Sequence, residues 1–423
     1  MNTLLKKKMG AIFLSFVIVL EGSSAYASES KTLLATKAKG AKKIVQVSDK
    51  FDINTIKTSI SGVQVIRLQD GTYIIISNNL SDTQLQKQLS KFKGIKKIQN
   101  PKKNIGIVKP IQRTPVQNVN PPSTNSSGGT IFNDSLYKYE WDIGYTESNK
   151  AWSLINQKRE VKVAVVDTGV DYNHVDLKNR VLKDLGYNFI NNTSDTMDDN
   201  SHGTHVSGII AAEANNKQGI SGITGSLDVK IIPVKVLNSK GEGQSDIIAK
   251  GIEYAADKGA DIINLSFGCD EESTDIEDAI QYARNKGVFV VAAAGNDNEN
   301  CDNSSPAGEV GAYTVAAINT SYRKSYFSDY GNSVEIAAPG EEIVSTVPGN
   351  KYEAWDGTSM AAPVVSGIAA MVKAENPSIT PSEMEDILNK SAVDIMQKGK
   401  DKYTGYGLVD AYKAVQLEKT MEK

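Results

Sequence analysis

The sequence of 423 residues has few of the residues on which several protein classes depend. It contains only two cysteines and three histidines, so the chain can form at most one internal disulfide and offers few candidates for a histidine base. No apolar run reaches the roughly 20 residues needed to cross a bilayer. The net charge of -3 does not support nucleic-acid binding, and an apolar content of 40% excludes disorder along the whole chain.

Residues 1–27 have the composition of a secretory signal peptide. Lys6, Lys7 and Lys8 precede an apolar run of about ten residues, and Ala25-Tyr26-Ala27 provides a small-x-small cleavage site. The apolar run is too short for a membrane anchor. We therefore expect a secreted, extracellular product that is a monomer without a stable membrane anchor.

Charge is distributed unevenly along the chain. Residues 28–113 carry 17 Lys and Arg against five Asp and Glu, whereas residues 114–423 carry 27 against 44. Apolar runs at 64–68 and 73–76 around a tight turn, followed by the helical spacing of Leu85, Leu89 and Phe92, predict a small basic α+β unit over residues 28–113. Residues 114–132, rich in Pro, Asn, Ser and Gly, are interpreted as a flexible linker without a packed fold.

A different pattern fills residues 133–423, where short runs of Val and Ile alternate with helix-like stretches. The strand candidates are residues 161–166, 229–236, 261–265, 288–293 and 313–318. Nearly continuous apolar strands separated by helices predict an α/β fold, with a parallel sheet covered by helices on both faces. Groups at the carboxyl ends of such strands face the ligand crevice.

Three segments at the expected strand ends and helix starts carry the groups that acyl transfer requires. Asp167 ends a strand in VVDTG, His202 enters a helix in SHGTHVSG, and Ser359 opens a helix in GTSMAAP. They supply an acid, a base and a nucleophile for hydrolysis of a peptide bond. Asn296, after another strand, and the Ser359 N–H would bind the oxyanion. A metal site built on His202 and His205 is disfavoured, because no thiolate or carboxylate set accompanies them.

These motifs resemble the subtilisin-like serine protease family. The resemblance covers about residues 133–415 and rests on the D-T-G, H-G-T-H-V-x-G and G-T-S-M-A-x-P boxes, in that order, with the intervening asparagine. It implies a subtilisin-like fold and a secreted serine endopeptidase made as a self-processing zymogen. Residues 28–113 would be the propeptide, which inhibits the enzyme and helps it to fold, and Arg113 is the expected maturation site.

Within this family, the chain length, the lysine-rich pro-region and the linker are most similar to the peptidases that remove leaders from lantibiotic precursors in Gram-positive bacteria. The resemblance therefore suggests a lantibiotic precursor as the substrate, cut after a basic residue. A broad-specificity extracellular degradative subtilisin is the alternative within the same class. An inactive subtilisin-like binding module is a remote alternative from another class.

The resemblance also implies how a substrate would bind. An extended peptide would pair with two stretches of backbone, and the matching positions are Gly241, Gly243, Ser266, Phe267 and Gly268. Asp270 and Asp297 lie near the expected specificity pocket, where a carboxylate would favour Arg or Lys before the cut. The alternative is that these acids form a solvated rim.

Calcium and a disulfide complete the implications of the resemblance. Asp134, Asp176 and Asn216 match positions that hold a structural Ca²⁺ in family members, with backbone carbonyls of the nearby loop completing an oxygen shell. Ordinary surface turns are the alternative. Cys269 and Cys301 follow two segments that should flank the specificity pocket, and they either form a disulfide that braces its wall or remain two thiols.

Overall fold

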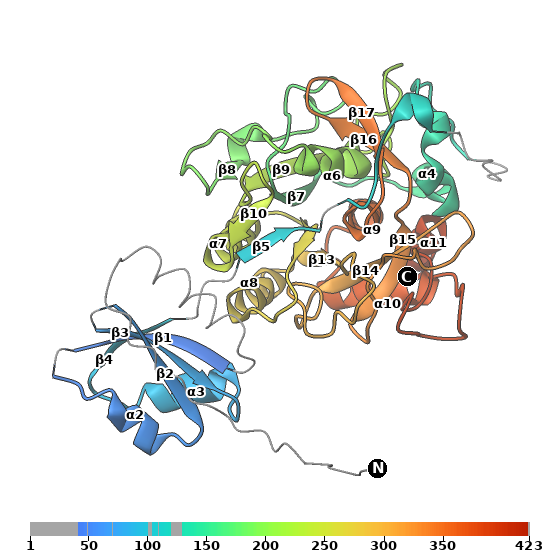
Figure 1. Cartoon of the computed structure of the whole chain (residues 1–423). Coiled ribbons are helices and arrows are strands. Elements are labelled where there is room, and N and C mark those ends of the chain that lie inside the picture. The colour runs from blue at the N-terminus through green and yellow to red at the C-terminus, as the bar shows by residue number, and fades with distance from the viewer. Residues whose placement is uncertain are drawn as a thin grey trace, which may run out of the picture. The chain divides into compact units, whose positions relative to one another are not determined.

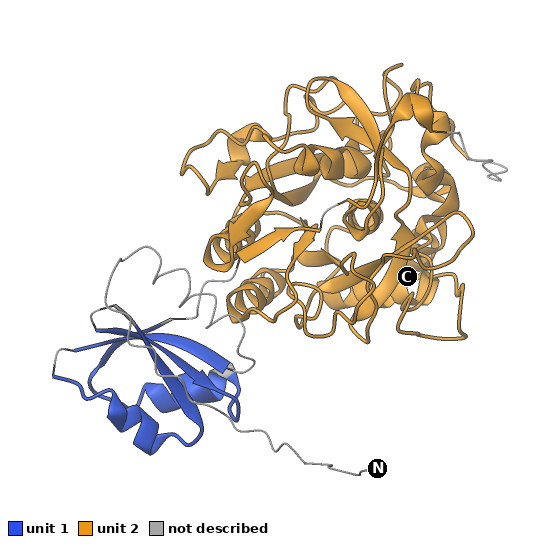
Figure 2. Cartoon of the chain, in the orientation of Figure 1, with its two compact units in different colours: residues 1–101 blue, residues 102–423 orange. Residues whose placement is uncertain are grey.

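The structure is a computed structural model that describes residues 41–48, 50–69, 71–99, 104–108, 110–119 and 129–421. The chain divides into two compact units, residues 1–101 and residues 102–423 (Figures 1 and 2). The predicted signal peptide, residues 1–27, lies outside the described residues. Among the helices of the described ranges, none is long and apolar enough to cross a membrane.

In the residues that the structure describes, the first unit is an antiparallel sheet of four strands with two helices. The strands are β1 (Ala41–Val47), β2 (Val63–Gln69), β3 (Thr72–Ser77) and β4 (Ile95–Gln99), in the order β2-β3-β1-β4, and the helices are α2 (Asn54–Ser59) and α3 (Asp82–Leu89). The expected hairpin is β2–β3, and a capping box between Ser81 and Gln84 starts α3. Leu85 and Leu89 pack with Val45 and Ile75, so the predicted α+β unit has its own core.

The second unit is built on a parallel sheet of seven strands in the order β15-β14-β13-β11-β7-β9-β8. The strands are β7 (Val161–Asp167), β8 (Tyr187–Asn188), β9 (Val229–Lys235), β11 (Ile262–Leu265), β13 (Phe289–Ala293), β14 (Tyr313–Ile318) and β15 (Val334–Pro339). Nearly every residue of the central strands is buried. This is the arrangement that continuous apolar strands predict.

Helices cover both faces of this sheet. Successive side chains of a strand point to opposite faces, so Val163 and Val165 pack with α6 (His202–Ala211) and α9 (Thr358–Glu375), whereas Ala164 and Val166 pack with α7 (Ser245–Asp257) and α8 (Thr274–Asn285). The other α-helices in the described part of this unit are α4 (Trp141–Tyr145), α5 (Ser148–Ala151), α10 (Pro381–Ser391) and α11 (Ala411–Met421). The predicted α/β fold is therefore confirmed (Figure 1).

Two small antiparallel sheets complete the second unit. One has the order β10-β5-β12 and consists of β10 (Glu242–Gln244), β5 (Asn104–Ile107) and β12 (Phe267–Gly268). The other has the order β16-β17-β6 and consists of β16 (Ile343–Val347), β17 (Lys351–Trp355) and β6 (Arg113–Pro115). β5 lies within the predicted propeptide, residues 28–113, and β6 begins at its predicted last residue, Arg113.

The division between the units therefore differs from the predicted domain boundary. Residues 104–119, as far as they are described, belong to the second compact unit, whereas the sequence predicts a propeptide that ends at 113 and a linker that begins at 114. Val116 and Val119 are buried, and Phe132 stacks on Trp152 at 4.6 Å between ring centroids. The composition of this segment does not predict its packing on the second unit. Backbone pairing with β17 does not depend on side-chain type, and two valines suffice to anchor a short segment. Residues 120–128 lie outside the described part of the chain.

Candidate active site

The central sheet and one helix bring together the acid and the base that the motifs predict. Asp167 is the last residue of β7, and His202 is the first residue of α6. Both side chains are fully buried, and the His202 Nδ1 lies 2.9 Å from each carboxylate oxygen of Asp167. This contact fixes the orientation of the imidazole, and its Nε2 is then the nitrogen that can accept a proton.

The nucleophile is oriented toward a segment of the same chain. Ser359 is the second residue of α9, and its Oγ lies 2.9 Å from the carbonyl oxygen of Val108 and 3.1 Å from that of Ser266. The His202 Nε2 is buried and has no hydrogen-bond partner among the described residues. A buried nitrogen without a partner is costly, and the Ser359 hydroxyl is the group whose proton it would accept in the reaction.

Asp198 ties the strand end that carries the acid to the helix start that carries the base. Its Oδ1 accepts a hydrogen bond of 2.9 Å from the Thr168 hydroxyl, directly after Asp167. Its Oδ2 accepts hydrogen bonds of 3.0 and 2.6 Å from the backbone N–H and the hydroxyl of Thr204, two residues after His202. One buried carboxylate thus sets the position of β7 relative to α6.

The predicted oxyanion donors lie beside the nucleophile. The Asn296 Oδ1 accepts two hydrogen bonds of 2.9 Å, from the backbone N–H and from the hydroxyl of Thr358. This orients the side-chain amide so that its Nδ2 remains the donating group. The Ser359 N–H belongs to the first turn of α9, where backbone N–H groups have no acceptor within the helix. The two donors are therefore the backbone N–H of the nucleophilic serine itself and the side-chain amide of Asn296, which is bonded to the preceding residue.

Pro363 inside α9 has a role in this site. A residue at that position would normally donate its N–H to the Ser359 carbonyl four residues earlier, and proline cannot. The Ser359 carbonyl instead accepts a hydrogen bond of 3.1 Å from the Ser266 hydroxyl. The helix thus lacks one internal hydrogen bond, and the carbonyl that it leaves available links Ser359 to Ser266, directly after β11.

A strand of the chain itself runs through the cleft. β5 pairs antiparallel with β10 on one side and with β12 on the other. The Ile107 N–H donates to the Gly241 carbonyl at 2.8 Å, and the Val108 N–H donates to the Ser266 carbonyl at 3.4 Å. All the residues predicted to bind substrate backbone line this strand, namely Gly241, Gly243, Ser266, Phe267 and Gly268.

Arg113, the expected maturation site, lies in another strand. It pairs with Trp355 in β17, and its guanidinium lies 4.0 Å from the centroid of the Trp355 ring. Within the described residues of the predicted propeptide, the carbonyl that contacts the Ser359 hydroxyl is that of Val108. The sequence contained no signal for this register, because it depends on which backbone segment enters the cleft and not on a motif.

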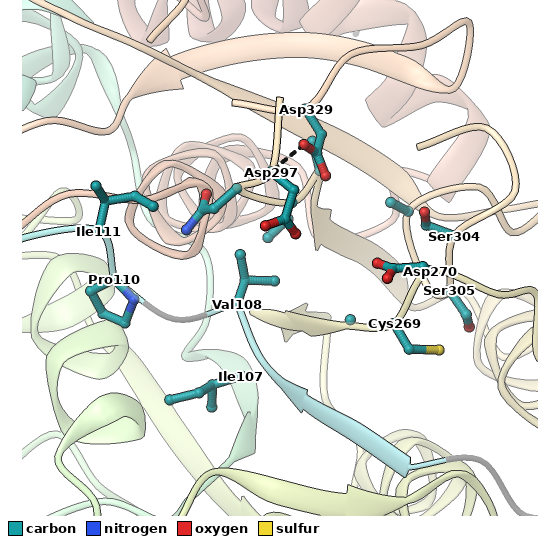
Figure 3. Close-up of a pocket in the computed structure, with 16 residues that line it drawn as sticks. Ile107, Val108, Pro110, Ile111, Cys269, Asp270, Asp297, Ser304, Ser305 and Asp329 are labelled. Atoms are coloured by element: carbon teal, nitrogen blue, oxygen red, sulfur yellow. Dashed lines mark hydrogen bonds between the residues drawn. The ribbon is translucent and has the colours of Figure 1, made fainter. Parts of the chain in front are cut away.

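Beside Val108 lies a pocket of about 420 Å³ that contains three carboxylates. Asp270 and Asp297 are the two that the sequence predicts, and Asp329 is the third (Figure 3). In this view Val108 lies between Pro110 and Ile111 on one side and Asp270 on the other. Among the described residues, no lysine or arginine forms an ion pair with any of the three.

Asp329 is the acid of this pocket that sequence reasoning missed. It is buried, and its Oδ1 accepts the backbone N–H groups of Asp297 and Glu299 at 2.9 and 2.8 Å. Burial, together with the negative charges of Asp297 and Asp270, raises its pKa to about 6. Gly295 is required beside it, because a Cβ there would lie 1.9 Å from the Asp329 Oδ2. In the sequence, Gly295 is the one signal that a side chain such as Asp329 lies close to the backbone at this point.

The two cysteines do not form the disulfide that the sequence allowed. The Cys301 Sγ lies 3.4 Å from the Ser333 hydroxyl, whereas the Cys269 Sγ donates to the Glu271 carbonyl at 3.2 Å. Each thiol thus has its own partner. Burial raises the pKa of Cys301 to about 11, which keeps it a thiol at neutral pH. The backbone of Cys269 pairs instead with Ser305, and this pairing holds the pocket wall without a covalent bond.

The three residues predicted to hold calcium lie together, with both aspartates hydrogen-bonded to Asn216. Asn216 donates its backbone N–H to Asp134 at 2.9 Å and its amide Nδ2 to Asp176 at 2.8 Å. Asp134 and Asp176 are both buried. Two buried carboxylates and an amide oxygen are ligands of the type that Ca²⁺ prefers. In this structure the carboxylates accept hydrogen bonds from the protein, Asp134 from Asn215, Asn216 and Ser221, and Asp176 from Asn216, Ile220 and Tyr352. No larger cluster of His, Cys, Asp and Glu suited to a metal occurs in the described ranges.

Comparisons with known proteins agree with this geometry. Residues 158–407 match the Subtilase family. The chain is 40% identical to the thermophilic serine proteinase of Bacillus sp. (strain AK1). The alignment of 310 residues covers 73% of this chain and 75% of that protein. It is 41% identical to thermitase of Thermoactinomyces vulgaris. That alignment of 270 residues covers 64% of this chain and 93% of thermitase.

A solved structure shows the same fold. Fervidolysin from Fervidobacterium pennivorans, described as a keratinolytic enzyme related to subtilisin, superimposes with a TM-score of 0.68 and 28% identity, covering 89% of this chain and 61% of that one. The family match includes the segments that carry Asp167, His202 and Asn296, and it extends past Ser359. On the sequence match, the fold and the arrangement of the site, this chain belongs to the subtilase family and is a serine endopeptidase.

Proposed function

We propose that this subtilase is a zymogen that cuts its own chain on the carboxyl side of Val108. The observation that carries the proposal is the distance of 2.9 Å between the Ser359 Oγ and the Val108 carbonyl oxygen. β5 lies between β10 and β12 as an extended substrate would. The sequence favoured Arg113, but the contact with the nucleophile supports Val108.

The reaction follows from the positions of the groups. The Ser359 Oγ attacks the carbonyl carbon of Val108 while the His202 Nε2 takes its proton, and Asp167 stabilises the imidazolium. The Asn296 amide and the Ser359 N–H bind the oxyanion. The bond to Lys109 breaks as His202 returns the proton to the leaving amine. Water then hydrolyses the acyl-enzyme by the same route, which releases a carboxylate at Val108 and restores the serine.

The self-cleavage proposal is tested by the N-terminal sequence of the purified product. We expect the catalytic chain to begin at Lys109, and Ser359→Ala to remain uncut under the same conditions. A product that begins at Thr114 would support the site expected from the sequence. A full-length chain that stays intact while it hydrolyses peptides would contradict the zymogen.

For substrates other than its own chain, we infer a preference for Arg or Lys before the cut. The pocket beside Val108 is lined by the buried Asp329 and by Asp270 and Asp297, which are exposed to solvent, and these carboxylates can pair with a cation. Val108, at the proposed self-cleavage site, has an uncharged side chain and forms no ion pair with these carboxylates. Matched peptides with Arg, Leu or Glu at that position test the preference, and equal or faster cleavage after Leu would contradict it.

Such a restricted pocket supports a processing role, which we propose to be removal of the leader from a lantibiotic precursor. A single cut in a leader peptide together with poor casein hydrolysis would support this role, whereas rapid hydrolysis of casein would favour a degradative enzyme. Labelling of Ser359 by a fluorophosphonate would exclude an inactive binding module. The relative called a cell wall-associated protease, from Bacillus subtilis, supports an extracellular location.

A structural Ca²⁺ completes the proposed enzyme. Asp134, Asp176 and the amide oxygen of Asn216 would hold it, after rotation of that amide from the orientation in which its nitrogen faces Asp176. The ion would neutralise two buried carboxylates and fix the loop at residues 215–220.

A further inference from the structure

Ten residues, which begin one position after Lys109, continue along the surface of the catalytic unit beyond the proposed cut. We call residues 110–119 the arm. The Ile111 N–H donates to the Asp356 carbonyl at 2.8 Å, and the Asp356 N–H donates to the Gln112 carbonyl at 3.0 Å. β6 then pairs antiparallel with β17, with Arg113 opposite Trp355. Because β17 leads directly into the turn that carries Ser359, the arm occupies the leaving-group side of the cleft.

A side-chain contact adds to the backbone pairing. The Arg113 guanidinium lies over the Trp355 ring, and Trp355 in turn stacks on His205, with ring centroids 4.2 Å apart. Burial lowers the pKa of Arg113, and the negative charges of Glu353 and Asp198 oppose that effect. A cation over an indole face with carboxylates nearby is a favourable and partly desolvated contact.

The far end of the arm is anchored by apolar packing. Val116 and Val119 are 7% and 6% exposed and pack in one cluster with Ala212, Val344 and Ala354. These residues come from the end of α6 and from β16 and β17. The arm therefore has two attachments, the pairing with β17 and the apolar cluster, and both are made to parts of the chain that remain in the mature enzyme.

We infer that the arm stays bound after the cut, as the N-terminal segment of the mature protease, and that it covers the leaving-group side of its cleft. The inference rests on the proposed cleavage after Val108. Residues up to Val108 lose their covalent link to the enzyme, whereas the arm remains joined to the catalytic unit through the chain. Rebinding of a tethered segment is intramolecular, with an effective concentration in the millimolar range for short flexible links.

The retained arm makes the enzyme select substrates by what lies after the cut. A peptide that extends past the scissile bond must displace the arm from β17 before it can pair there. A substrate with a small chromogenic amide after the cut does not reach β17 and needs no displacement. The arm therefore lowers activity on long peptides and leaves activity on short chromogenic substrates unchanged.

The test compares two substrates on self-processed enzyme variants that begin at Lys109. Arg113→Ala removes the contact with Trp355, and Val119→Asp places a charge in the apolar cluster. For each variant we expect kcat/KM on a peptide with residues on both sides of the cut to rise about fivefold, with the chromogenic substrate unchanged. The matched control is Lys390→Ala, which removes a positive charge from an exposed ion pair with Asp386.

The outcomes separate this inference from the proposal on which it rests. Variants that begin at Lys109 but cleave both substrates at wild-type rates would overturn the retained arm and leave self-cleavage intact. Equal changes on both substrates would show a general effect on the site and would also overturn it. A product beginning elsewhere contradicts the proposed cut before any rate is compared.

Discussion

Asn296 shows how a single side chain is prepared for the transition state. Its Oδ1 is held by both the N–H and the hydroxyl of Thr358, so its Nδ2 does not have to reorient when the oxyanion forms. Asn296→Ala should lower kcat about 10²- to 10³-fold with little change in KM, because the donor acts mainly on charge that develops in the transition state. Steady-state kinetics on a chromogenic peptide measures both values.

The control for this variant is Asn191→Ala, an exposed asparagine outside the site, which should retain wild-type kinetics. A rise in KM with unchanged kcat in Asn296→Ala would contradict the assigned role, because it would mean that the amide binds the ground state equally well.

Asp329 should make the preference for a basic residue depend on pH. Burial raises its pKa to about 6, so it is charged and attracts a cation above that pH and is neutral below it. Asp270 and Asp297 face the same pocket, and Lys324 lies near enough for its pKa to be affected by Asp329. The ratio of kcat/KM for Arg over Leu substrates should therefore fall as the pH decreases from about 7 to 5.

Asp329→Asn tests this assignment. The variant should show a lower Arg-to-Leu ratio above pH 6 and should lose most of the dependence of that ratio on pH. Asp386→Asn, at an exposed position on α10, serves as the control and should follow the wild-type curve. A wild-type ratio that is constant between pH 5 and 7 would refute the role of Asp329.

At the scale of elements, the site depends on the link between β7 and α6. Asp198 joins Thr168 at the end of the strand to Thr204 in the first turn of the helix. Asp198→Asn keeps the size of the side chain but replaces one acceptor with a donor facing N–H or O–H groups. We expect kcat to fall about 10²-fold through misplacement of the acid–base pair, with KM nearly unchanged.

Kinetics and thermal unfolding together measure this effect. Asp184→Asn, at an exposed position in a short 3-10 helix (Lys183–Leu185), is the matched control. If Asp198→Asn lowered the melting temperature but left kcat unchanged at a temperature where the variant is folded, the carboxylate would have only a structural role.

The elements that the sequence predicted well are those determined by local patterns. The apolar runs that became β7, β9 and β13 are buried on both faces, so composition alone identifies them. The motifs predict Asp167 at a strand end and His202 and Ser359 at helix starts, and the structure places these residues at the end of β7 and in the first turns of α6 and α9. The fold class followed from these signals without any knowledge of long-range contacts.

The features that the sequence did not predict depend on contacts between distant segments. β5 and β6 pair with strands more than a hundred residues away, and their polar or mixed composition resembles that of a loop. Asp329 lies in a turn between β14 and β15, and it belongs to the pocket only because Gly295 permits its approach. The sequence left open whether Cys269 and Cys301 form a disulfide, and in the structure they are two thiols, each with its own hydrogen-bonding partner.

At the scale of the whole molecule, the proposed calcium ion should contribute to stability. An ion that binds only the folded state adds roughly 2.7 kcal/mol when its free concentration is 100 times its dissociation constant. Addition of Ca²⁺ to chelator-treated enzyme should therefore raise the melting temperature, and Asp176→Asn should reduce that rise. Calorimetry measures both, with Mg²⁺ as the control ion. A melting temperature that does not respond to calcium would contradict the site.

The near-neutral net charge of the chain combines two parts of opposite sign that the proposed cut would separate. Residues 28–108 carry 15 Lys and Arg against five Asp and Glu, and residues 109–423 carry 29 against 44. Opposite net charges favour association of the cleaved propeptide with the enzyme, and salt screens this attraction over a Debye length that falls from about 10 Å at 0.1 M to about 3 Å at 1 M.

Inhibition by the propeptide should therefore weaken as the ionic strength increases. After self-cleavage of the Ser359-containing enzyme, we expect activity on a neutral chromogenic peptide to appear about tenfold faster at 1 M NaCl than at 0.1 M, since salt speeds release of the basic fragment. The control is enzyme already freed of its propeptide, whose rate on the same peptide should change little with salt. If activity appeared at the same rate at both salt concentrations, non-electrostatic contacts would dominate the association, and the separation of charge along the chain would have no part in inhibition.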